Sequence, residues 1–450
     1  MKIVIKKGLD LPLLGGPAGS VGSLSTPSRL SLNLDPFEKI GFRLLVKVGE
    51  SVKIGQPLAE NKGAPGQMFV SPAGGVVVEL RRGPKRRLRD IVIEVGDQEE
   101  FHQNPPLNLD TASREQLSVL LMQSGLFPHI RMRPFGLVAD PKFPPRRIFV
   151  SAVESAPYAP SAELQVAGHE KSFQTGLGAL TLLTDGKVHL VYREESSCAA
   201  FLEASGVEKH SARGPHPIGN PSVHIHHIHP IQNPEDFVWT LSAIDVIAIG
   251  KMVESGRYFY ERIIALAGEG VPEEKRGFYK SRAGLPISAF VRGVSKDATP
   301  CLISGDPLVG QKVDESDFLS FNHTAFSVIP RSEKRQLFHF LGLGRKKFSA
   351  FRAYFTKTFA AGYSFTTSQH GERRPFIDGS VYDRVMPMRI PTMELIKAIL
   401  AEDYDLAQTL GLLEVVEEDF ALPAFVCPSK IDMIGIAKQG LHRFSKEMGH

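Results

Sequence analysis

The chain has 450 residues, of which 42% are hydrophobic and 23% charged, and its formal net charge is +4 at pH 7. This length allows two to four domains, because a domain usually contains about 100–200 residues. The net charge is too small to indicate a nucleic-acid-binding protein, since phosphate recognition needs concentrated Lys and Arg. The three cysteines, Cys198, Cys301 and Cys427, are odd in number and far apart, so they favour a reducing compartment such as the cytoplasm over a disulfide framework.

The first residues, MKIVIKKGLDLPLLGG, have neither the apolar core nor the cleavage site of a signal peptide. The longest apolar runs, such as DVIAIGKMV, are far shorter than the roughly 20 residues needed to cross a bilayer. We therefore expect a protein that is not exported and that meets a membrane only peripherally.

Residues 1–100 are typical of a small β domain. Short apolar runs such as RLLVKVGESVKIGQPLAE and SPAGGVVVEL alternate with glycine turns. They resemble the biotinyl/lipoyl-type barrel-sandwich, in which a hairpin lysine carries the cofactor. The matching loop, ENKGAPGQ, contains Lys62 without the flanking residues of either carrier type. We therefore prefer a structural barrel to a carrier domain.

Residues 101–256 are predicted to form a Rossmann-like α/β domain. After a proline-containing linker, DTASREQLSVLLMQSG predicts a helix with Asp110 or Thr111 as its N-cap. RRIFVSAVES, DGKVHLVYRE, PSVHIHHIHP and DVIAIGKMV are interpreted as strands, with helices between some of them. Alternating β and α segments indicate a parallel sheet. No GxGxxG loop follows the first of these strands, so no dinucleotide site is predicted.

Two further domains are expected in the rest of the chain. Residues 257–330 contain short strands, including LPISAFVRG and HTAFSVIP, separated by glycine turns, and they indicate a β-rich domain. Residues 331–450 have mostly helical spacing, as in KRQLFHFLGLG, PTMELIKAILAEDYDLAQTLGLL and DMIGIAKQGLHRFSKEM. The fold class is therefore α/β and multidomain.

A run of histidines, His224, His226, His227 and His229, is the most visible candidate metal site. In a strand, the first and second would point to one face and the third and fourth to the other, so each face would offer one H-x-H pair. Zinc needs a third protein ligand, which the sequence does not supply. Interface or backbone hydrogen bonds are the preferred interpretation. A stand-alone metal-dependent enzyme built on either pair is the alternative function.

Two basic segments and one arginine pair are further candidates for binding. RRGPKRRLRD at 81–90 is interpreted either as a solvated hairpin tip or as a contact for anionic lipid or an acidic partner. RKKFSAFRAYFTKTF at 345–359 places phenylalanines on one helical face, for which core packing is preferred to membrane docking. In GLFPHIRMRPFG, Arg131 and Arg133 lie beside Phe135. This group suits a flat ring with carbonyl oxygens, an acidic partner or a structural ion pair.

Long segments spread along the chain, including RMRPFG, AVESAPYAPSAELQVAGHEKSFQTGLGAL, PSVHIHHIHPI, CLISGDPLVGQ and YDRVMPMRIPTMEL, resemble the A-subunit family of the sodium-translocating NADH:quinone oxidoreductases. The resemblance implies a peripheral subunit on the cytoplasmic face of the bacterial inner membrane. It implies a six-subunit complex that passes electrons from NADH through flavins and iron–sulfur centres of partner subunits to ubiquinone and exports Na⁺.

The resemblance further implies docking on the membrane-embedded B-subunit near the site of quinone reduction, with Arg131, Arg133 and Phe135 as quinone-proximal candidates. It implies no catalytic residue, metal or redox cofactor in this chain. The flavoprotein relatives of the family bind flavin through a Gly-rich loop, which SGLFPHIRMRPFG replaces with bulky residues. They also hold iron–sulfur clusters through sets of cysteines, of which Cys427 alone remains.

The same relatives imply an order of four domains. These are a barrel-sandwich over 1–100, a Rossmann-like domain over 101–256, a ubiquitin-like β-grasp domain of the SLBB type over 257–330, and a helical domain over 331–450.

Overall fold

A computed structural model describes residues 1–291, 300–332, 341, 344, 347–350, 354–356, 362–371 and 373–449. The strands in these ranges form four sheets. Most of the helical segment predicted at KRQLFHFLGLG and most of the phenylalanine-rich segment at 345–359 lie outside the described residues.

Two small sheets between residues 29 and 95 confirm the β structure predicted there. The first contains, in order, β3 (Arg29–Asn33), β9 (Leu88–Val95), β8 (Gly75–Arg82) and β5 (Ser51–Val52). The second contains β4 (Phe42–Leu44), β6 (Pro57–Asn61) and β7 (Met68–Val70). Both sheets contribute to one apolar core, in which Leu30 and Phe69 are buried. Lys62 is exposed in the turn after β6.

The first 23 residues pair with strands outside these two sheets. β1 (Lys2–Val4) runs parallel to β14 (Glu208–Arg213), and β2 (Gly22–Ser23) runs parallel to β17 (Gly277–Arg282). The beginning of the chain therefore connects two other parts of the fold.

A seven-stranded sheet carries the α/β part of the chain. Its order is β1, β14, β13 (Lys187–Arg193), β12 (Arg147–Ala152), β15 (Val238–Ser242), β10 (Arg131–Arg133) and β11 (Leu137–Val138). The strands from β1 to β15 are parallel, while β10 and β11 are antiparallel to their neighbours. The strands predicted at RRIFVSAVES and DGKVHLVYRE are β12 and β13. Alternate side chains enter different cores, so Leu190 packs with the cluster around α3 (Glu170–Leu182) and α6 (Ala243–Ser255), whereas Val191 packs with the C-terminal helices.

Two segments predicted as strands are helices. PSVHIHHIHP forms α5 (Pro221–Ile228), with proline in its first turn, where its missing N–H costs no helical hydrogen bond. DVIAIGKMV lies within α6, where Ser242 and Asp245 form a capping box. Both helices bury apolar residues, such as Val223 and Ile225 of α5 and Val246 and Ile247 of α6. A short buried apolar run fits a strand and a helix equally, so the prediction is wrong there.

Smaller corrections concern two helices. The N-cap of α1 (Arg114–Gln123) is Ser113 and not Asp110 or Thr111, because its side chain accepts from the Gln116 N–H in a capping box. LPISAFVRG is predicted as a strand, but it contains α7 (Ser288–Val291).

The β-rich region predicted after residue 256 is present as a six-stranded sheet. The order is β19 (Gln311–Lys312), β18 (Pro300–Ser304), β20 (Ala325–Pro330), β16 (Glu261–Ala267), β17 and β2. Ile264 and Phe326 of this sheet enter the same core as the two small sheets. The β-rich parts of the chain are therefore packed together.

The C-terminal segment confirms the helices predicted after residue 391. Its helices among the described residues are α9 (Ser380–Asp383), α10 (Thr392–Leu400), α11 (Tyr404–Thr409), α12 (Ala421–Val426) and α13 (Met433–Glu447). Short α-helices elsewhere are α2 (Ala162–Val166) and α4 (Ala199–Leu202). In the described part of the chain, the 3₁₀ turns are η1 (Asp35–Phe37), η2 (Pro84–Arg86), η3 (Phe127–His129), η4 (Glu273–Lys275), η6 (Leu412–Glu414) and η7 (Glu417–Phe420).

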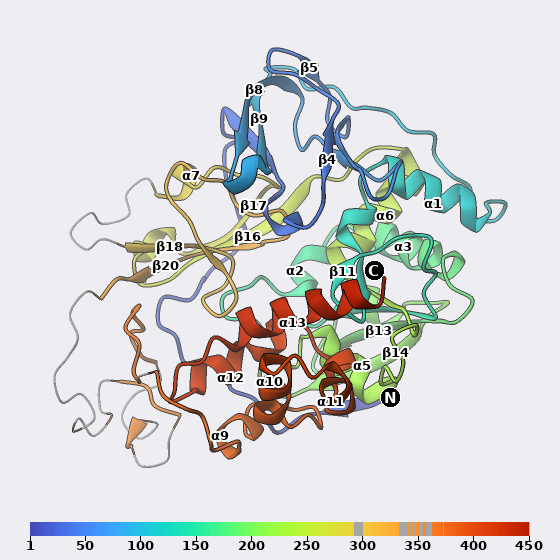
Figure 1. Cartoon of the computed structure of the whole chain (residues 1–450). Coiled ribbons are helices and arrows are strands. Elements are labelled where there is room, and N and C mark those ends of the chain that lie inside the picture. Colours follow the sequence, from blue (N-terminus) through green and yellow to red (C-terminus); the bar gives the residue numbers. More distant parts are fainter. Residues whose placement is uncertain are drawn as a thin grey trace.

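Figure 1 shows the blue strands β8 and β9 at the top, β16 and β20 at the left, and the red C-terminal helices across the lower half. Within the described ranges, no helix combines the length and apolar character needed to cross a membrane.

Candidate functional site

Arg133 joins two prominent sequence features, the RMRPF segment and the histidine run. It lies on β10 and is only 5% exposed. Its Nη1 donates to Ser222 Oγ on α5 at 2.8 Å, and its Nη2 donates to Glu418 Oε1 on η7 at 3.3 Å. One guanidinium thus ties the antiparallel side of the sheet to α5 and to the C-terminal segment. For Arg133, the structural ion pair is the interpretation that fits these contacts.

Carboxylates on η7 complete this buried polar cluster. Asp419 accepts from Asn220 Nδ2 and from the Val416 N–H, both at 2.9 Å. Burial raises the pKa of Glu418 and Asp419, while the positive charge of Arg133 opposes that rise. The Glu418 side chain is still 41% exposed, so water screens part of this interaction. The cluster can hold charge and connect elements.

Of the three quinone-proximal candidates, only Arg131 is a partly exposed residue. Its guanidinium carbon lies 5.4 Å from the centre of the Phe37 ring. Phe135 is 4% exposed, and its ring packs edge-on against Phe444 of α13 at 5.8 Å. Arg133 and Phe135 thus lie inside the contact with the C-terminal helices, and Arg131 lies at its margin.

The histidine run does not form the H-x-H pairs expected of a strand. Residues two apart on a helix point in nearly opposite directions, so His224 and His226 are separated. His224 Nε2 donates to the Ile218 carbonyl at 2.7 Å, and burial lowers the pKa of His224 to about 4. His227 Nδ1 donates to the Val223 carbonyl within α5 at 2.8 Å. The preferred interpretation, backbone hydrogen bonding, describes these two side chains.

His226 makes contacts with the C-terminal segment. Its Nδ1 lies 2.7 Å from Glu414 Oε2, and its Nε2 accepts the Arg389 backbone N–H at 3.2 Å. His229 caps the C-terminal end of α5 and is exposed. Both nitrogens of His226 are engaged in these contacts. His226 is therefore not free to bind a metal together with His224, as the metal-dependent alternative requires.

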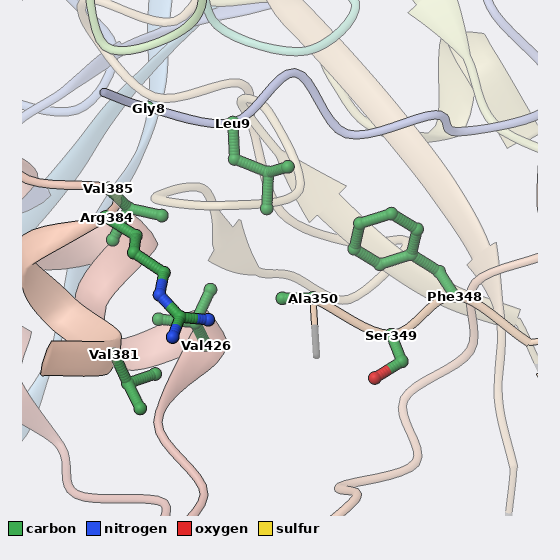
Figure 2. Close-up of a pocket in the computed structure, with 9 residues that line it drawn as sticks. All are labelled: Gly8, Leu9, Phe348, Ser349, Ala350, Val381, Arg384, Val385 and Val426. Carbon is green, nitrogen blue, oxygen red and sulfur yellow. The ribbon is translucent and has the colours of Figure 1, made fainter. Parts of the chain in front are cut away.

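A small pocket lies where the N-terminal segment meets the C-terminal region (Figure 2). Its volume is about 120 Å³, well below the roughly 300 Å³ of a typical ligand pocket. Figure 2 shows the Arg384 guanidinium beside Val426, with the Phe348 ring on the other side. Phe348 also packs near Tyr363 and Phe425, so for this residue core packing is the interpretation that fits.

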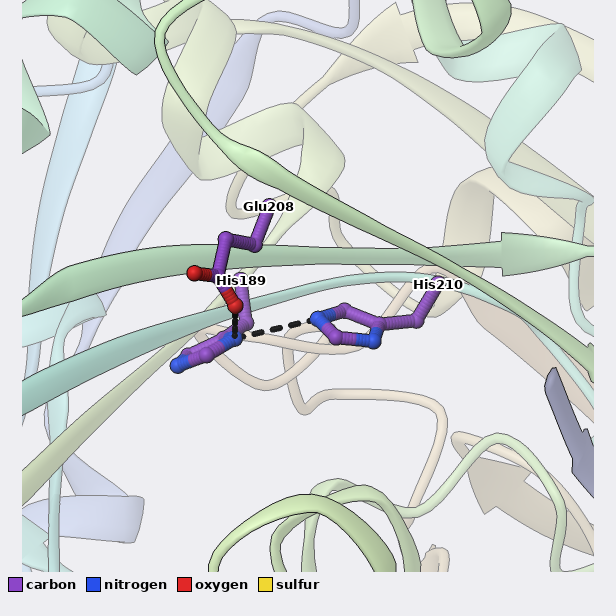
Figure 3. A group of neighbouring side chains, drawn as sticks. All are labelled: His189, Glu208 and His210. Carbon is purple, nitrogen blue, oxygen red and sulfur yellow. Dashed lines mark hydrogen bonds and ion pairs between the residues drawn. The ribbon is translucent and has the colours of Figure 1, made fainter. Parts of the chain in front are cut away.

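A second cluster of imidazoles, which the sequence did not reveal, lies on β13 and β14. His189, Glu208 and His210 place one ligand-type atom each within 4.8 Å of the others (Figure 3). His189 Nδ1 is 3.0 Å from His210 Nε2 and 3.5 Å from Glu208 Oε2. The three residues come from two separate segments that meet only through strand pairing. A local motif search therefore has no signal for them.

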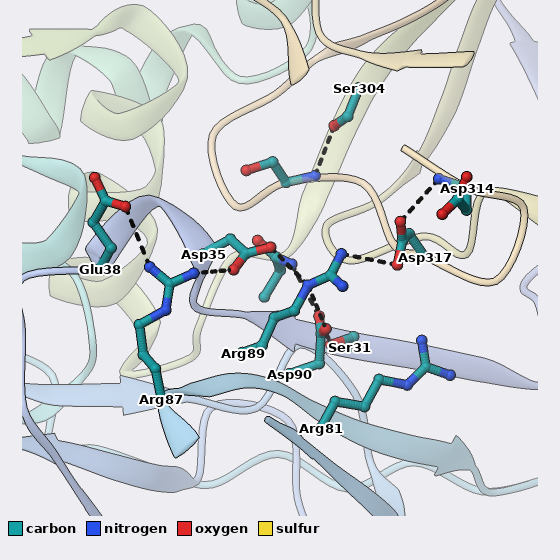
Figure 4. A network of polar contacts seen from close by, with 12 residues as sticks. Ser31, Asp35, Glu38, Arg81, Arg87, Arg89, Asp90, Ser304, Asp314 and Asp317 are labelled. Carbon is teal, nitrogen blue, oxygen red and sulfur yellow. Dashed lines mark hydrogen bonds and ion pairs between the residues drawn. The ribbon is translucent and has the colours of Figure 1, made fainter. Parts of the chain in front are cut away.

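Several arginines of the basic segment at 81–90 are engaged within the fold (Figure 4). Arg87 donates to Asp35 at 2.7 Å and to Glu38 at 3.4 Å. Arg89 donates to Asp35 and to Asp317, both at 2.8 Å. The Arg89 contacts join the small β sheets to the six-stranded sheet region. Part of this positive charge therefore stabilises the packing of domains rather than meeting solvent.

The exposed basic residues of the same segment are Arg82, at the end of β8, and two residues of its turn. Lys85 and Arg86 are exposed and adopt positive φ angles of 55° and 58°. Nearby, an open pocket of about 410 Å³ is lined by Pro84 and Arg87 of this segment, by Glu38 and Lys39, and by His442 of α13. Four of these five lining residues have ionisable side chains.

Two family models match the chain. The NqrA N-terminal barrel-sandwich hybrid domain matches residues 3–96, and the NqrA second alpha/beta domain matches residues 112–258. These descriptions agree with the β structure observed near the beginning of the chain and with the seven-stranded sheet and its helices.

Full-length relatives carry one name. The A-subunit of the Na(+)-translocating NADH-quinone reductase of Chlamydia pneumoniae is 37% identical, over 100% of this chain and 98% of the relative. The protein of the same name from Chlamydia caviae is 37% identical over the same shares. The one from Photorhabdus laumondii is 37% identical, over 99% of this chain and 100% of the relative. A solved NAD⁺-reducing [NiFe]-hydrogenase chain is 14% identical over 78% of this chain and 67% of that chain, with a TM-score of 0.37.

The hydrogenase similarity is too weak to support an argument. The identity to the curated relatives, over essentially the whole length of both partners, is decisive. The chain belongs to the A-subunit family of the Na⁺-translocating NADH-quinone reductases, and it is thus one subunit of a multi-subunit respiratory complex and not an enzyme on its own.

Proposed function

We propose that the chain is a peripheral subunit on the cytoplasmic face of the bacterial inner membrane and that it docks on the membrane-embedded B-subunit. We propose that it supports the site at which the complex reduces ubiquinone and that it holds no redox cofactor of its own. The supporting observation is the full-length similarity to A-subunit proteins. Flavins and iron–sulfur centres would then belong to partner subunits, and ubiquinone would be the substrate of the complex.

The packing of two segments supports the part of the proposal that concerns cofactors. The segment that replaces a flavin loop forms η3 and β10, and its Phe127 and Met132 are buried in the apolar core. Cys427 is buried, and its Sγ lies 3.2 Å from the Tyr382 hydroxyl. A side chain packed in this way belongs to the core of the C-terminal helices. Both segments therefore have a structural role in the chain.

The position of Arg131 supports the part that concerns quinone. The guanidinium of Arg131, a partly exposed residue, lies over Phe37, and the two residues after Phe37, Glu38 and Lys39, line the open pocket beside α13. A quinone carbonyl accepts hydrogen bonds, and its ring stacks on flat groups, so a guanidinium beside an aromatic ring suits a headgroup. Arg133 and Phe135 would then act indirectly, by holding β10 against α5 and α13.

We also propose finer names for the folded parts. Five parallel strands with crossover helices on both faces of the sheet are typical of a Rossmann-like domain. In the six-stranded sheet, β16 and β20 are parallel neighbours, and α7 lies between β17 and β18 along the chain. That arrangement supports a β-grasp domain, and the four domains would follow the ranges expected from the sequence.

Co-expression tests the docking. Affinity-tagged full-length chain and the other five subunits are produced together in a bacterial membrane and solubilised in mild detergent. The proposal expects the B-subunit to be captured with the chain and to form cross-links to it when the other subunits are omitted. Capture only through a different partner would contradict docking on the B-subunit. Flavin or iron–sulfur absorbance in the purified chain would contradict the absence of a cofactor.

The quinone part is tested separately in the assembled complex. Arg131→Met keeps an unbranched apolar stem and removes the donors of the guanidinium, so the KM for ubiquinone should rise several-fold while NADH oxidation by an artificial acceptor stays unchanged. Arg114→Met is the matched control, because Arg114 lies on α1 and pairs with the exposed Asp185. An unchanged KM for ubiquinone in Arg131→Met would remove Arg131 from the proposal and leave the docking intact.

A further inference from the structure

We propose that His189, Glu208 and His210 form a binding site for one divalent transition-metal ion of the zinc class. This site goes beyond the proposed function, because it needs neither a protein partner nor quinone. It lies on the same face of the seven-stranded sheet as α5, at the beginning of β13 and β14.

Strand pairing alone brings the three side chains together. His189 and Glu208 are directly paired in the parallel register of β13 and β14. His210 is two residues beyond Glu208, so both point to the same face of β14. Figure 3 shows the Glu208 carboxylate and the His210 ring both directed at the near nitrogen of His189.

Two of the three separations between these atoms are close to those of a metal site, and the third, between Glu208 and His210, is within 4.8 Å. His189 Nδ1 lies 3.0 Å from His210 Nε2 and 3.5 Å from Glu208 Oε2. Two ligand atoms of a tetrahedral zinc ion are separated by about 3.3 Å, since each lies roughly 2.0–2.1 Å from the metal. The side chains therefore need only small adjustments to coordinate an ion. The His189 ring is also held in place by stacking on Phe149, with 4.6 Å between the ring centres.

The charge state of the imidazoles suits metal binding. Burial lowers the pKa of His189 to about 3 and that of His210 to about 4, so both rings are neutral at pH 7. Neutral imidazole is the form that coordinates metals. A neutral His189 cannot form an ion pair with Glu208. If His189 Nδ1 carries a proton, it can donate that proton in a hydrogen bond to only one of its two neighbours, Glu208 Oε2 and His210 Nε2. A cation at the centre would satisfy all three atoms together.

Ligand type and position indicate which ion binds and what it does. Two imidazoles and one carboxylate are a zinc-type ligand set. Glu208 is 48% exposed, so water can complete the coordination. Ligand sites of open α/β sheets lie at the carboxyl ends of the strands, whereas this cluster lies at the opposite ends. We therefore assign the ion a structural role, in which it connects β13 to β14.

Other groups near the cluster limit its affinity. The positive charges of Arg147 and Lys187 lower the pKa of His189, so they also oppose a bound cation. His189 Nε2 and His210 Nδ1 are buried and have no hydrogen-bond partner among the described residues. A partner at such a nitrogen usually increases metal affinity by about 10–100-fold. The site should therefore bind metal stoichiometrically but release it to a strong chelator.

Cobalt(II) is a direct probe, because it replaces zinc and absorbs visible light with an intensity that reports tetrahedral coordination. The full-length chain is stripped with a chelator, dialysed and titrated with Co²⁺ at pH 7.5. We expect one Co²⁺ per chain with tetrahedral absorption, displacement by one equivalent of Zn²⁺, and a higher Tm with metal than without. Atomic emission spectroscopy of the dialysed, metal-loaded chain gives the number of metal ions per chain independently.

Variants decide whether these three residues hold the ion. Glu208→Gln changes a half-exposed side chain without changing its size, and it should weaken Co²⁺ binding at least about 10-fold while the circular dichroism stays unchanged. His210→Ala should abolish the tetrahedral absorption. His442→Ala removes an imidazole on α13 and should bind Co²⁺ like the unmodified chain.

Three results would overturn the site: no saturable binding, binding of Co²⁺ without tetrahedral absorption, or equal binding in Glu208→Gln and the unmodified chain. The last result is decisive even if His210→Ala does not fold. Because metal binding is measured on the isolated chain, each of these results leaves the docking on the B-subunit untouched.

Discussion

His226 on α5 donates from Nδ1 to Glu414 Oε2 across 2.7 Å, and its Nε2 accepts the Arg389 backbone N–H at 3.2 Å. A nitrogen that accepts a hydrogen bond carries no proton, so these contacts assign the Nδ1–H tautomer to His226. One ring therefore fixes α5 to two parts of the C-terminal segment. This histidine holds helices together and has no free nitrogen for a metal.

His226→Ala should lower the free energy of unfolding by about 1–3 kcal/mol, because it removes both hydrogen bonds and leaves the largely buried Glu414 carboxylate without its partner. His227→Ala at the next position is the control, since, within the described ranges, the His227 side chain donates only to the Val223 carbonyl of its own helix. We expect it to cost about 0.5–1.5 kcal/mol. Urea unfolding followed by circular dichroism measures both. Equal losses would contradict a special role of His226 in joining the segments.

Sequence patterns predict the central strands of the large sheet but not the helix that carries the histidines. RRIFVSAVES and DGKVHLVYRE are strands as predicted, because apolar residues with short polar ends fit the central strands β12 and β13. PSVHIHHIHP alternates like a strand and is nevertheless a helix. Its proline in the first turn was the available signal for a helix start.

The candidate sites could also be predicted only in part, because a sequence pattern identifies residues that are adjacent in the chain but not the distant segments that contact them. Arg131, Arg133 and Phe135 could be identified because they are adjacent in sequence. Their separation into one partly exposed and two buried side chains depends on α5 and on the C-terminal helices, which approach from far along the chain. The pairing of β13 with β14, which brings His189 to Glu208, is also long-range. The polar segment EKHSAR of β14 has no apolar pattern by which to predict it.

The close contact between α3 and α6 predicts how substitutions of their glycines change the stability of the chain. A Cβ on Gly250 would lie 1.8 Å from the Ser172 carbonyl oxygen, so Gly250→Ala should separate the helices and cost roughly 1–3 kcal/mol. Gly178 also lies on α3, but a Cβ there would lie 3.7 Å from Leu109 Cδ1, an ordinary contact. Gly178→Ala should therefore stabilise the chain by up to about 1 kcal/mol. Thermal unfolding measures the stability of both variants. A change of stability of the same sign in both would contradict this packing.

The contacts of Arg89 lead to a third prediction. Its Nε donates to Asp35 and its Nη2 to Asp317, which ties the small β sheets to the loop before β20 (Figure 4). Arg89→Ala removes both charged hydrogen bonds and should cost about 2–4 kcal/mol, because each contributes roughly 1–2 kcal/mol when partly buried. Arg29→Ala is the control on the same sheet, since its 3.8 Å contact with Glu94 is exposed on both sides. It should cost less than about 0.5 kcal/mol. Denaturant unfolding compares them, and similar losses would refute the role of Arg89.

The last prediction concerns Glu154, which follows β12 at the carboxyl end of the sheet. Burial raises the pKa of Glu154 to about 7. The hydrogen bonds from the Ala156 and Ser155 backbone N–H groups lower this pKa, whereas the negative charge of Asp306 raises it further. The folded chain therefore binds this proton more tightly than the unfolded chain, in which the pKa is about 4.5. It follows that the stabilisation linked to this proton is complete below about pH 4.5 and is lost as the pH rises through about 7.

Glu154→Gln removes this dependence, because the amide oxygen can still accept the two backbone N–H groups but has no proton to lose. We expect the free energy of unfolding of the unmodified chain to fall relative to that of the variant by about 1–3 kcal/mol between pH 5 and pH 8, with partial solvent contact reducing the full value of the shift. Urea unfolding of both proteins at several pH values gives the difference directly. A difference that stays constant across this range would mean that Glu154 is already ionised in the folded chain at pH 5, and the physical account of its burial would then be wrong.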